Sequence, residues 1–294
     1  MSRRKKGKRT VSAPNNPPPG GLTCPLCCSP DGKAVTRDLS PFYRCCRCGI
    51  VFNSAYRPLR YDERYFLDDY KNQYGRTYAE DRDAIRRLAD VRLRNVFALR
   101  GGKPGRGDLS LLDIGSALGF FMESAWDAGV GRVSGVEISR YACDWCRRET
   151  GFRVVNSAFE KTEFDETFDI ITAWYFIEHC EHPGEIMRRI YALLNPGGVF
   201  AFSAPSVFGP QFLFDRKGWA GSHPEDHRID FSPAVAARIL KRMGFRSVMV
   251  RAAGVHPDRV VPRTSPFFRP FSLLYRRMAP LLRFSDTIEV YALK

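Results

Sequence analysis

The 294-residue sequence predicts an α/β protein with a Rossmann-like, doubly wound, seven-stranded sheet, preceded by a small cysteine ribbon and a helical linker. Three observations support this. An apolar strand at 109–114 runs into the turn Gly115-Ser116-Ala117-Leu118-Gly119, and an apolar-periodic helix follows. Short apolar strands then alternate with amphipathic helices as far as residue 252. A last apolar strand at 287–293 completes the set.

The first half of the predicted sheet lies between residues 109 and 155. Leu109–Ile114 is expected to be a buried strand because apolar residues surround its single acid, and Gly115 allows a sharp turn at its end. The helix Phe120–Ala128 begins after Gly119, where a missing side chain lets a ligand approach the helix N-terminus. The other predicted elements are a strand at 132–137, a helix at 141–150 and a short strand at 152–155.

The second half begins with the strand Phe168–Trp174. Prolines in the first turn mark the starts of two helices, 183–194 and 232–243, and Ser232 is the expected N-cap of the second. The remaining predicted elements are a turn at 195–198 and strands at 199–203, 245–250 and 287–293.

The composition is that of a basic globular protein. Hydrophobic residues make up 44% of the chain, which excludes global disorder, and the formal net charge is +14. This charge favours a polyanion or an anionic membrane as partner, and it fits equally a soluble protein with a charged tail. The longest uncharged run, 190–214, contains three prolines, so no transmembrane helix is expected. The basic N-terminus lacks the apolar segment of a signal peptide, and we expect a cytoplasmic protein.

Residues 1–21 are predicted to be a disordered basic arm. Six lysines and arginines lie between residues 3 and 9, and prolines and glycines follow, so nothing here can bury a core. The arm could hold phosphates of nucleic acid or lipid, or it could simply keep the chain soluble.

Residues 22–57 are predicted to form a zinc ribbon. The pairs Cys24/Cys27 and Cys45/Cys48 are separated by 17 residues, a spacing typical of four-cysteine zinc sites. The chain has nine cysteines, and this odd number favours a metal site in a reducing compartment over a disulfide framework. Four thiolates leave no open position on the ion, so the expected zinc is structural.

Residues 58–104 are predicted to be a helical linker or lid. The segment is rich in tyrosine, and apolar residues recur at helical spacing between Tyr78 and Leu99. The tyrosines could stack on bases or sugars, but packing against the main domain is the favoured interpretation. Glycines at 101–107 separate this segment from the first strand, so we place the main domain at 105–294.

An acid, Glu137, ends the second strand 24 residues after Asp113. In nucleotide-binding folds an acid at this place accepts hydrogen bonds from ribose hydroxyls. An exposed acid at a strand end is common by itself. It is the occurrence of Glu137 together with the glycine turn that indicates a nucleotide-type site.

These motifs resemble the class I S-adenosylmethionine-dependent methyltransferases. The stretch 111–119 is similar to the first motif of that family and Val136-Glu137 to the second. The strand 168–171 followed by Phe176-Ile177-Glu178-His179 is similar to the fourth-strand motif, and 193–198 to the turn before the fifth strand. Ala117 departs from the commoner pattern, which has glycine at this place.

The resemblance implies a set of residues around S-adenosylmethionine. The amino-acid part of the cofactor would lie at the glycine turn, Glu137 would hold the ribose, and Ile138 would pack on the adenine. The implied cofactor-binding residues are Asp113, Gly115, Ser116, Gly119, Glu137, Ile138, Ala158 and Phe159.

The candidate catalytic residues are His179, Glu178 and His227. Displacement at a sulfonium methyl mainly needs positioning and an unprotonated nucleophile, and a hydroxyl acceptor also needs a base. His179 follows the fourth strand, at the edge where sites of this fold lie, so it could transfer the proton or only shape the pocket. The loop 221–227, which contains His227, is expected to cover the same edge and to form the acceptor pocket.

The whole arrangement resembles bacterial methyltransferases that act on sugars and cell-surface glycans. The stretch 44–53 and the pattern Tyr61-x3-Tyr65-Phe66 carry this part of the resemblance. It implies a sugar or glycan-type acceptor, methylated on oxygen or carbon, on a nucleotide or lipid carrier. The alternatives are an RNA methyltransferase whose ribbon and basic arm hold phosphates, and a non-catalytic cofactor-binding scaffold. The fourth strand lacks the Asn/Asp-Pro-Pro-aromatic motif that follows it in base-amino methyltransferases.

Residues 263–284 contain several arginines, no acid and many large apolar residues. The pattern suits an amphipathic element on anionic lipid, although its prolines shorten any helix. A packed insertion before the last strand is the favoured interpretation.

Overall fold

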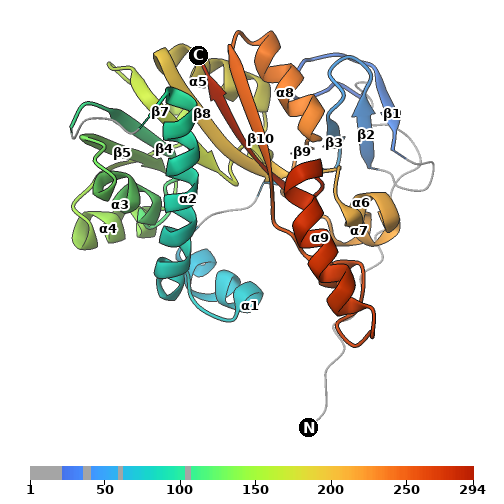
Figure 1. Cartoon of the computed structure of the whole chain (residues 1–294). Helices are drawn as coiled ribbons and strands as arrows, with labels where there is room; N and C mark the ends of the chain where they lie inside the picture. Colours follow the sequence, from blue (N-terminus) through green and yellow to red (C-terminus); the bar gives the residue numbers. More distant parts are fainter. Residues whose placement is uncertain (1–21, 36–40, 59–61, 103–106) are drawn as a thin grey trace.

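The computed structural model describes residues 22–35, 41–58, 62–102 and 107–294 (Figure 1). The predicted basic arm at 1–21 lies outside these residues. Within them a seven-stranded mixed sheet has the order β10-β11-β8-β7-β4-β5-β6, in which β11 alone is antiparallel to its neighbours. The strands are β4 (Ser110–Ile114), β5 (Arg132–Glu137), β6 (Arg153–Asn156), β7 (Phe168–Trp174), β8 (Leu194–Pro205), β10 (Ser247–Ala253) and β11 (Thr287–Leu293). The predicted Rossmann-like fold is confirmed.

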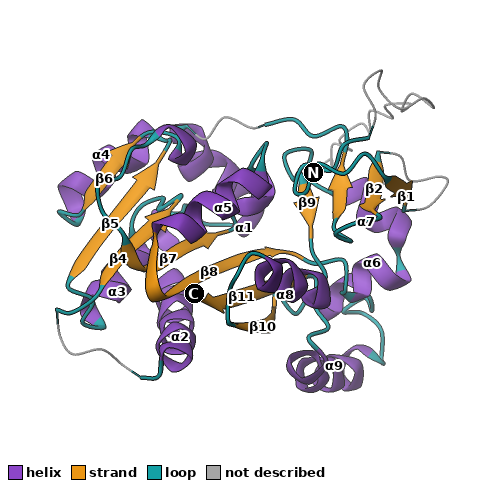
Figure 2. Cartoon of the chain, turned by 90° about the horizontal axis from the view of Figure 1, so that it is seen from above, coloured by secondary structure: helices purple, strands orange, loops and turns teal. Residues whose placement is uncertain are grey.

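Helices cover both faces of this sheet (Figure 2). One apolar core joins α2 and α3 to one face, and a larger core joins α5 and α8 to the other. The amphipathic periodicity of these segments explains the arrangement, because each helix turns its apolar stripe to the strands. The helices of this layer structure are α2 (Arg82–Arg100), α3 (Phe120–Asp127), α4 (Arg140–Glu149), α5 (Pro183–Leu193) and α8 (Pro233–Arg242).

One local expectation was wrong, and one was met only in part. Residues 195–198 are not a separate turn but part of β8, because Gly197 and Gly198 form backbone hydrogen bonds with Lys294. β8 accommodates them as a bulge: Leu194 lies opposite Phe168 and Val199 opposite Ile170. In α8, Ser232 occupies the N-cap position, but its side chain makes no capping hydrogen bond.

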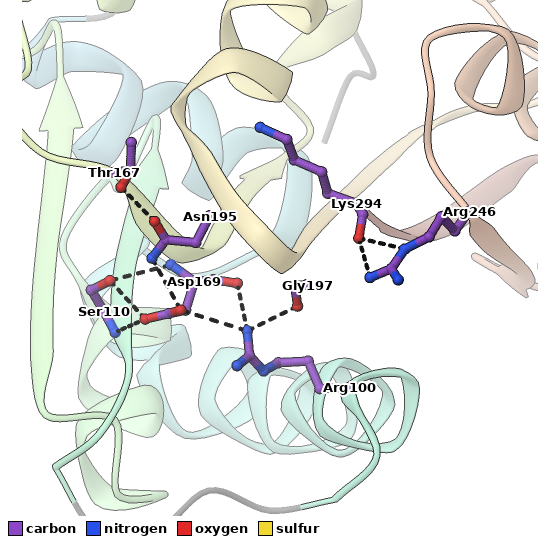
Figure 3. A network of polar contacts seen from close by, with 8 residues as sticks. All are labelled: Arg100, Ser110, Thr167, Asp169, Asn195, Gly197, Arg246 and Lys294. Atoms are coloured by element: carbon purple, nitrogen blue, oxygen red, sulfur yellow. Dashed lines mark hydrogen bonds and ion pairs between the residues drawn. The ribbon is translucent and has the colours of Figure 1, made fainter.

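A polar network fixes the bulge and the starts of the central strands (Figure 3). The Asp169 carboxylate accepts hydrogen bonds from the amide of Ser110 at 3.0 Å and from the side chain of Asn195 at 3.1 Å. Arg100, at the end of α2, donates to the carbonyl oxygens of Asp169 and Gly197. These groups lie at the amino ends of β4 and β7, so they stabilise the sheet edge opposite the glycine turn.

The cysteine ribbon forms a second, four-stranded sheet with a strand of the main domain. Its order is β1-β2-β3-β9, with β1 at Gly32–Ala34, β2 at Phe42–Cys45, β3 at Val51–Asn53 and β9 at Ile229–Asp230. Most buried ribbon residues belong to the same apolar core as α5 and α8, whereas Phe42 and Val51 pack in a separate cluster with Trp219. At Gly184, in the first turn of α5, a Cβ atom would lie 2.1 Å from the carbonyl oxygen of Leu26, so only glycine permits this approach. The division of the chain into arm, ribbon, linker and main domain stays a prediction. The close approach of Leu26 to Gly184 shows that the ribbon packs tightly on α5.

The tyrosine-rich segment packs over the starts of α3 and α4. It contains a short π-helix at Tyr65–Asp69 and the helix α1 at Tyr70–Tyr74. Phe66 is buried and lies 5.8 Å from the ring of Tyr141, and Tyr78 stacks on Phe120 at 5.7 Å. The favoured interpretation of this segment, packing on the main domain, agrees with these contacts.

Residues 263–284 contain a longer helix than their prolines led us to expect. The helix α9 spans Phe268–Leu282 with Pro280 inside it, and Figure 1 shows it projecting from the body of the molecule. Two short helices, α6 (Pro210–Phe214) and α7 (Arg216–Ser222), precede β9. Among the described residues, every helix is too short or too polar to cross a membrane.

Candidate active site

The glycine turn after β4 has the backbone geometry that its sequence requires. Gly115 and Gly119 both adopt positive φ, +70° and +82°, where a side chain is strained. A Cβ on Gly115 would lie 3.1 Å from the ring of Phe176, which follows β7. The turn is therefore packed directly against the segment that leads to Glu178 and His179.

Ala117 is the irregular position of the turn. Its φ is +48°, a conformation that costs a residue with a side chain about 1–2 kcal/mol. Its amide donates a 2.9 Å hydrogen bond to Oε2 of Glu137, which holds the strained backbone in place. Ala117 therefore adopts the positive φ that the commoner glycine would adopt at this position.

Glu137 lies at the end of β5 and is 6% exposed. Its second carboxylate oxygen accepts a 2.8 Å hydrogen bond from the amide of Ser139. Burial raises the pKa of this carboxyl group, and the hydrogen bonds from Ser139 and Ala117 oppose the shift. Each oxygen of an ionised carboxylate has a second lone pair, so Glu137 can still accept two hydroxyl donors.

Asp113 is buried below the turn. Its Oδ1 accepts a 2.6 Å hydrogen bond from the hydroxyl of Thr172 on β7. Burial raises the pKa of Asp113 to about 7, against the opposing effect of the Thr172 hydrogen bond. The hydroxyl of Ser116 is also buried, and no hydrogen-bond partner for it exists among the described residues. This hydroxyl lies against Gly135 of β5, where a Cβ atom would come within 2.6 Å of it, and its role in holding a cofactor stays a prediction.

The residues expected around an adenine lie in different surroundings. Ile138 is 60% exposed and lines a hollow of about 620 Å³, together with residues from the start of α4 and Asp62 and Glu63. Phe159 is instead 1% exposed in the main core, where the Arg189 guanidinium lies 5.1 Å from its ring. Ala158 precedes it at the start of a short 3-10 turn. The structure brings Ile138, and not Phe159, to the hollow.

Four polar residues gather beyond the carboxyl end of β7, and we call them the edge cluster: Glu178, His179, Asp226 and His227. Nδ1 of His179 lies 2.8 Å from Oδ2 of Asp226 and 3.1 Å from its carbonyl oxygen. Because both neighbours of Nδ1 are acceptors, this nitrogen carries the proton, and Nε2 is the basic one. The ring of His227 meets that of His179 edge to face, with centroids 4.8 Å apart.

The environment changes the proton affinity of each of these groups. Burial raises the pKa of Glu178 to about 7, although the neighbouring His179 opposes it. Burial and the charge of His179 lower the pKa of His227 to about 4. For His179, burial lowers the pKa, but the hydrogen bond and charge of Asp226 and the charge of Glu178 raise it by more.

Backbone contacts hold the loop of Asp226 and His227 between the ribbon and β7. The amide of Arg228 donates a 2.6 Å hydrogen bond to the carbonyl of Glu178, while its own carbonyl accepts one from the amide of Asn53. Nε2 of His223 lies 2.9 Å from Oδ2 of Asp230. His223 therefore anchors the start of the loop, and the ribbon supports the segment that carries Asp226 and His227.

Sequence reasoning missed two of these residues. Asp226 stood beside the predicted His227, but nothing in the sequence showed that it contacts a histidine 47 positions earlier. Thr172 lies inside an apolar strand and carried no signal of its contact with Asp113. The three predicted catalytic candidates do come together, and their roles stay predictions.

The four predicted ribbon cysteines form one cluster. The sulfur atoms of Cys24 and Cys48 are 3.6 Å apart, as are those of Cys27 and Cys45. A tetrahedral zinc with bonds of about 2.3 Å places its sulfurs about 3.8 Å apart, so the cluster fits this ion. Gly49, which follows Cys48, has φ +87°, as the turn of a zinc knuckle requires.

The known proteins that this chain resembles are methyltransferases. A family model described as "Methyltransferase domain" matches residues 78–250. A protein of Bordetella avium named ubiquinone biosynthesis O-methyltransferase is 26% identical over 222 residues, which cover 70% of this chain and 90% of that protein. A protein of the same name from Aeromonas salmonicida is 24% identical over 189 residues, 58% of this chain and 75% of its own length.

Solved structures share the fold at low identity. A methyltransferase of Archaeoglobus fulgidus, described as dependent on S-adenosylmethionine, superposes with a TM-score of 0.50 and 20% identity, covering 78% of this chain and 99% of its own. The plantazolicin methyltransferase BamL, in complex with a desmethyl analogue and S-adenosylhomocysteine, gives a TM-score of 0.51 and 12% identity, covering 79% and 93%.

Removing the buried hydroxyl of Ser116 tests the cofactor side of the site. Because this hydroxyl has no described partner, we expect Ser116→Ala to leave the free energy of unfolding nearly unchanged. Its affinity for S-adenosylmethionine, measured by calorimetric titration, should fall about tenfold, as the loss of one hydrogen bond predicts. Ser124→Ala, a buried serine in α3, is the control that should bind normally. Equal affinities of Ser116→Ala and the unmodified protein would contradict the placement of the cofactor.

Proposed function

Because the chain belongs to the methyltransferase-domain family and is an S-adenosylmethionine-dependent methyltransferase, we propose that it methylates a hydroxyl oxygen of a small-molecule acceptor. The edge cluster is the observation that carries this proposal. It contains an oriented histidine, buried acids and a second histidine at the carboxyl edge of β7, beside the segment that contacts the glycine turn.

The proposed reaction needs few chemical groups. The acceptor oxygen attacks the methyl carbon, the bond from that carbon to the sulfonium sulfur breaks, and the sulfur keeps the electron pair. A neutral hydroxyl must also lose its proton, because protonated ether oxygen is a strong acid. Nε2 of His179 is the basic atom in the edge cluster that receives this proton, because Nδ1 of the same ring already donates to Asp226.

We propose a sugar-type hydroxyl as the acceptor, with RNA as the alternative. The resemblance of the ribbon and linker to sugar and glycan methyltransferases supports a sugar-type hydroxyl on a nucleotide or lipid carrier. The names of the relatives support oxygen as the methylated atom. RNA is the alternative acceptor, favoured by the net charge of +14. The packing of the ribbon against α5 and β9 argues against it, because it occupies ribbon surface that would have to meet RNA.

A variant pair tests the proposed reaction. We expect His179→Asn to lower kcat at least about a hundredfold, the usual contribution of a positioned base, with unchanged affinity for S-adenosylmethionine. His182→Asn, an exposed histidine in the same segment, should keep full activity. Transfer of radiolabelled methyl is measured to a sugar nucleotide, a lipid-linked sugar, a hydroxylated ubiquinone precursor and RNA. Label in RNA, or on nitrogen or carbon, would overturn the proposal of a small-molecule hydroxyl.

We further propose that the cysteine cluster binds one structural zinc ion and that the ribbon positions the acceptor side. The fit of the sulfur distances supports the ion, and the contacts of Asn53 and Arg228 support the positioning role. Loss of the ribbon contact would move Asp226 and His227 but leave the glycine turn intact.

Gly184→Ala tests this role without touching the cysteines. The added Cβ meets the carbonyl of Leu26, so the ribbon must shift. We expect about one equivalent of zinc and normal cofactor affinity, with methyl transfer lowered about tenfold to a hundredfold by misplaced groups. Gly221→Ala has open space around it and serves as the control. Normal methyl transfer by Gly184→Ala would show that the ribbon is not needed for positioning.

The exposed face of α9 supports membrane contact. Leu273 and Leu281 are 73% and 74% exposed, and Phe267 just before the helix is 73% exposed. Phe214 of α6, 71% exposed, continues this apolar surface through Phe284. Residues 259–285 contain several arginines and no acid, so the positive charge of this segment complements anionic lipid. We propose that this face rests on an anionic membrane that presents a lipid-linked acceptor.

Vesicle binding tests the membrane contact. The protein should sediment with phosphatidylcholine vesicles that contain phosphatidylglycerol, and less in high salt, because screening weakens the arginine contribution. Leu273→Glu with Leu281→Glu should abolish sedimentation, whereas Leu88→Glu, an exposed leucine of α2, should not. Sedimentation of the double variant at the level of the unmodified protein would exclude α9 as the binding face.

A further inference from the structure

One carboxylate and two imidazoles meet in the edge cluster. The ligand atoms of Glu178, His179 and His227 all lie within 4.8 Å of one another. We propose that these three residues hold a divalent metal ion, at a site separate from the four cysteines. A set of one oxygen and two imidazole nitrogens suits Mn²⁺, Fe²⁺, Co²⁺ or Zn²⁺. Bonds of about 2.1 Å would draw the ligand atoms somewhat closer together.

Glu178 gives the independent observation. Its side chain is 0% exposed, and neither carboxylate oxygen has a hydrogen-bond partner among the described residues. A buried carboxylate without partners is strongly unfavourable, and proteins normally pair such a group or let it coordinate a metal. Asp113, Glu137 and Asp226, the other buried acids near the site, each accept at least one hydrogen bond. Glu178 alone among these four has no hydrogen-bond partner for either carboxylate oxygen among the described residues.

The contact between His179 and Asp226 has the form of a second coordination shell. Metal-binding histidines usually donate their other ring N–H to a carboxylate, which fixes the ring and raises the basicity of the coordinating nitrogen. Here Nδ1 faces Asp226 at 2.8 Å, so Nε2 is the nitrogen for the metal. Asp226 itself is held by the backbone contacts of its loop to Glu178 and the ribbon.

Three protein ligands leave positions on the ion open, as in catalytic rather than structural sites. This consequence rests on the proposed function: an acceptor hydroxyl that occupies an open position loses its proton more easily, because the cation stabilises the alkoxide. With the ion bound, His179 acts as a ligand, and the proton passes to water. The cation site also explains why Glu178 stands beside two histidines.

Titration with Mn²⁺ tests the site in the full-length protein. The ribbon is first loaded with one equivalent of zinc, and thiolates are poor ligands for Mn²⁺. Electron paramagnetic resonance of free Mn²⁺ should show one bound ion per chain. We expect Glu178→Gln, which keeps the size of the side chain, to weaken binding more than about tenfold, and Asp226→Asn about tenfold. His182→Asn is the control that should bind Mn²⁺ like the unmodified protein.

Two results would overturn the cation site: no binding of Mn²⁺ or Co²⁺ at millimolar concentration, or equal binding by Glu178→Gln. Full methyl transfer with the site empty would overturn the role of the cation in the reaction and leave the proposed function intact. Conversely, Mn²⁺ bound through Glu178 without methyl transfer to any hydroxyl acceptor would support the cation site and contradict the proposed function. The melting temperature of each variant confirms that it is folded, and Mn²⁺ should raise it only where the ion binds.

Discussion

The acceptor side of the site depends on a pairing of only two residues between β3 and β9. Phe52 lies opposite Ile229 and Val51 opposite Asp230. A two-residue strand has no stability of its own, so β9 depends on this edge together with the backbone contacts of Arg228 to Glu178 and of Phe231 to Pro205 and Val207. The ribbon in turn is too small to fold on its own apolar core, and most of its buried residues pack in the core that α5 and α8 share. The positions of Asp226 and His227 therefore depend on contacts of their loop with both the ribbon and the segment that follows β7.

Besides Asp226, which pairs with His179, three acids lie buried near the site, and the protein compensates each of them differently. Glu137 accepts two backbone N–H groups, and Asp113 accepts the hydroxyl of Thr172. Glu178 has neither kind of partner among the described residues. A native fold rarely keeps such a group without a reason, because replacement by an apolar side chain would remove the cost. This difference between the three acids is the reason for proposing a ligand at Glu178 rather than at Asp113 or Glu137.

Sequence reasoning predicted the parts of the protein that local pattern determines. Strands β5, β7 and β11 have their predicted bounds, since apolar runs bounded by turns define them. The four cysteines were found because two tight turns must supply the thiolates. The bulge at 195–198 was missed because its pairing partner, Lys294, is the last residue of the chain. The same limit hid the role of Asp226, which depends on a contact between distant segments.

The two halves of the site therefore differ in their physical basis. The cofactor half is one continuous turn whose backbone conformation is fixed by Gly115, Gly119 and the hydrogen bond to Ala117. The acceptor half is assembled from β3, the end of β7 and the loop before β9. The acceptor half therefore requires several distant segments to fold together, whereas the cofactor half requires mainly the turn that follows β4.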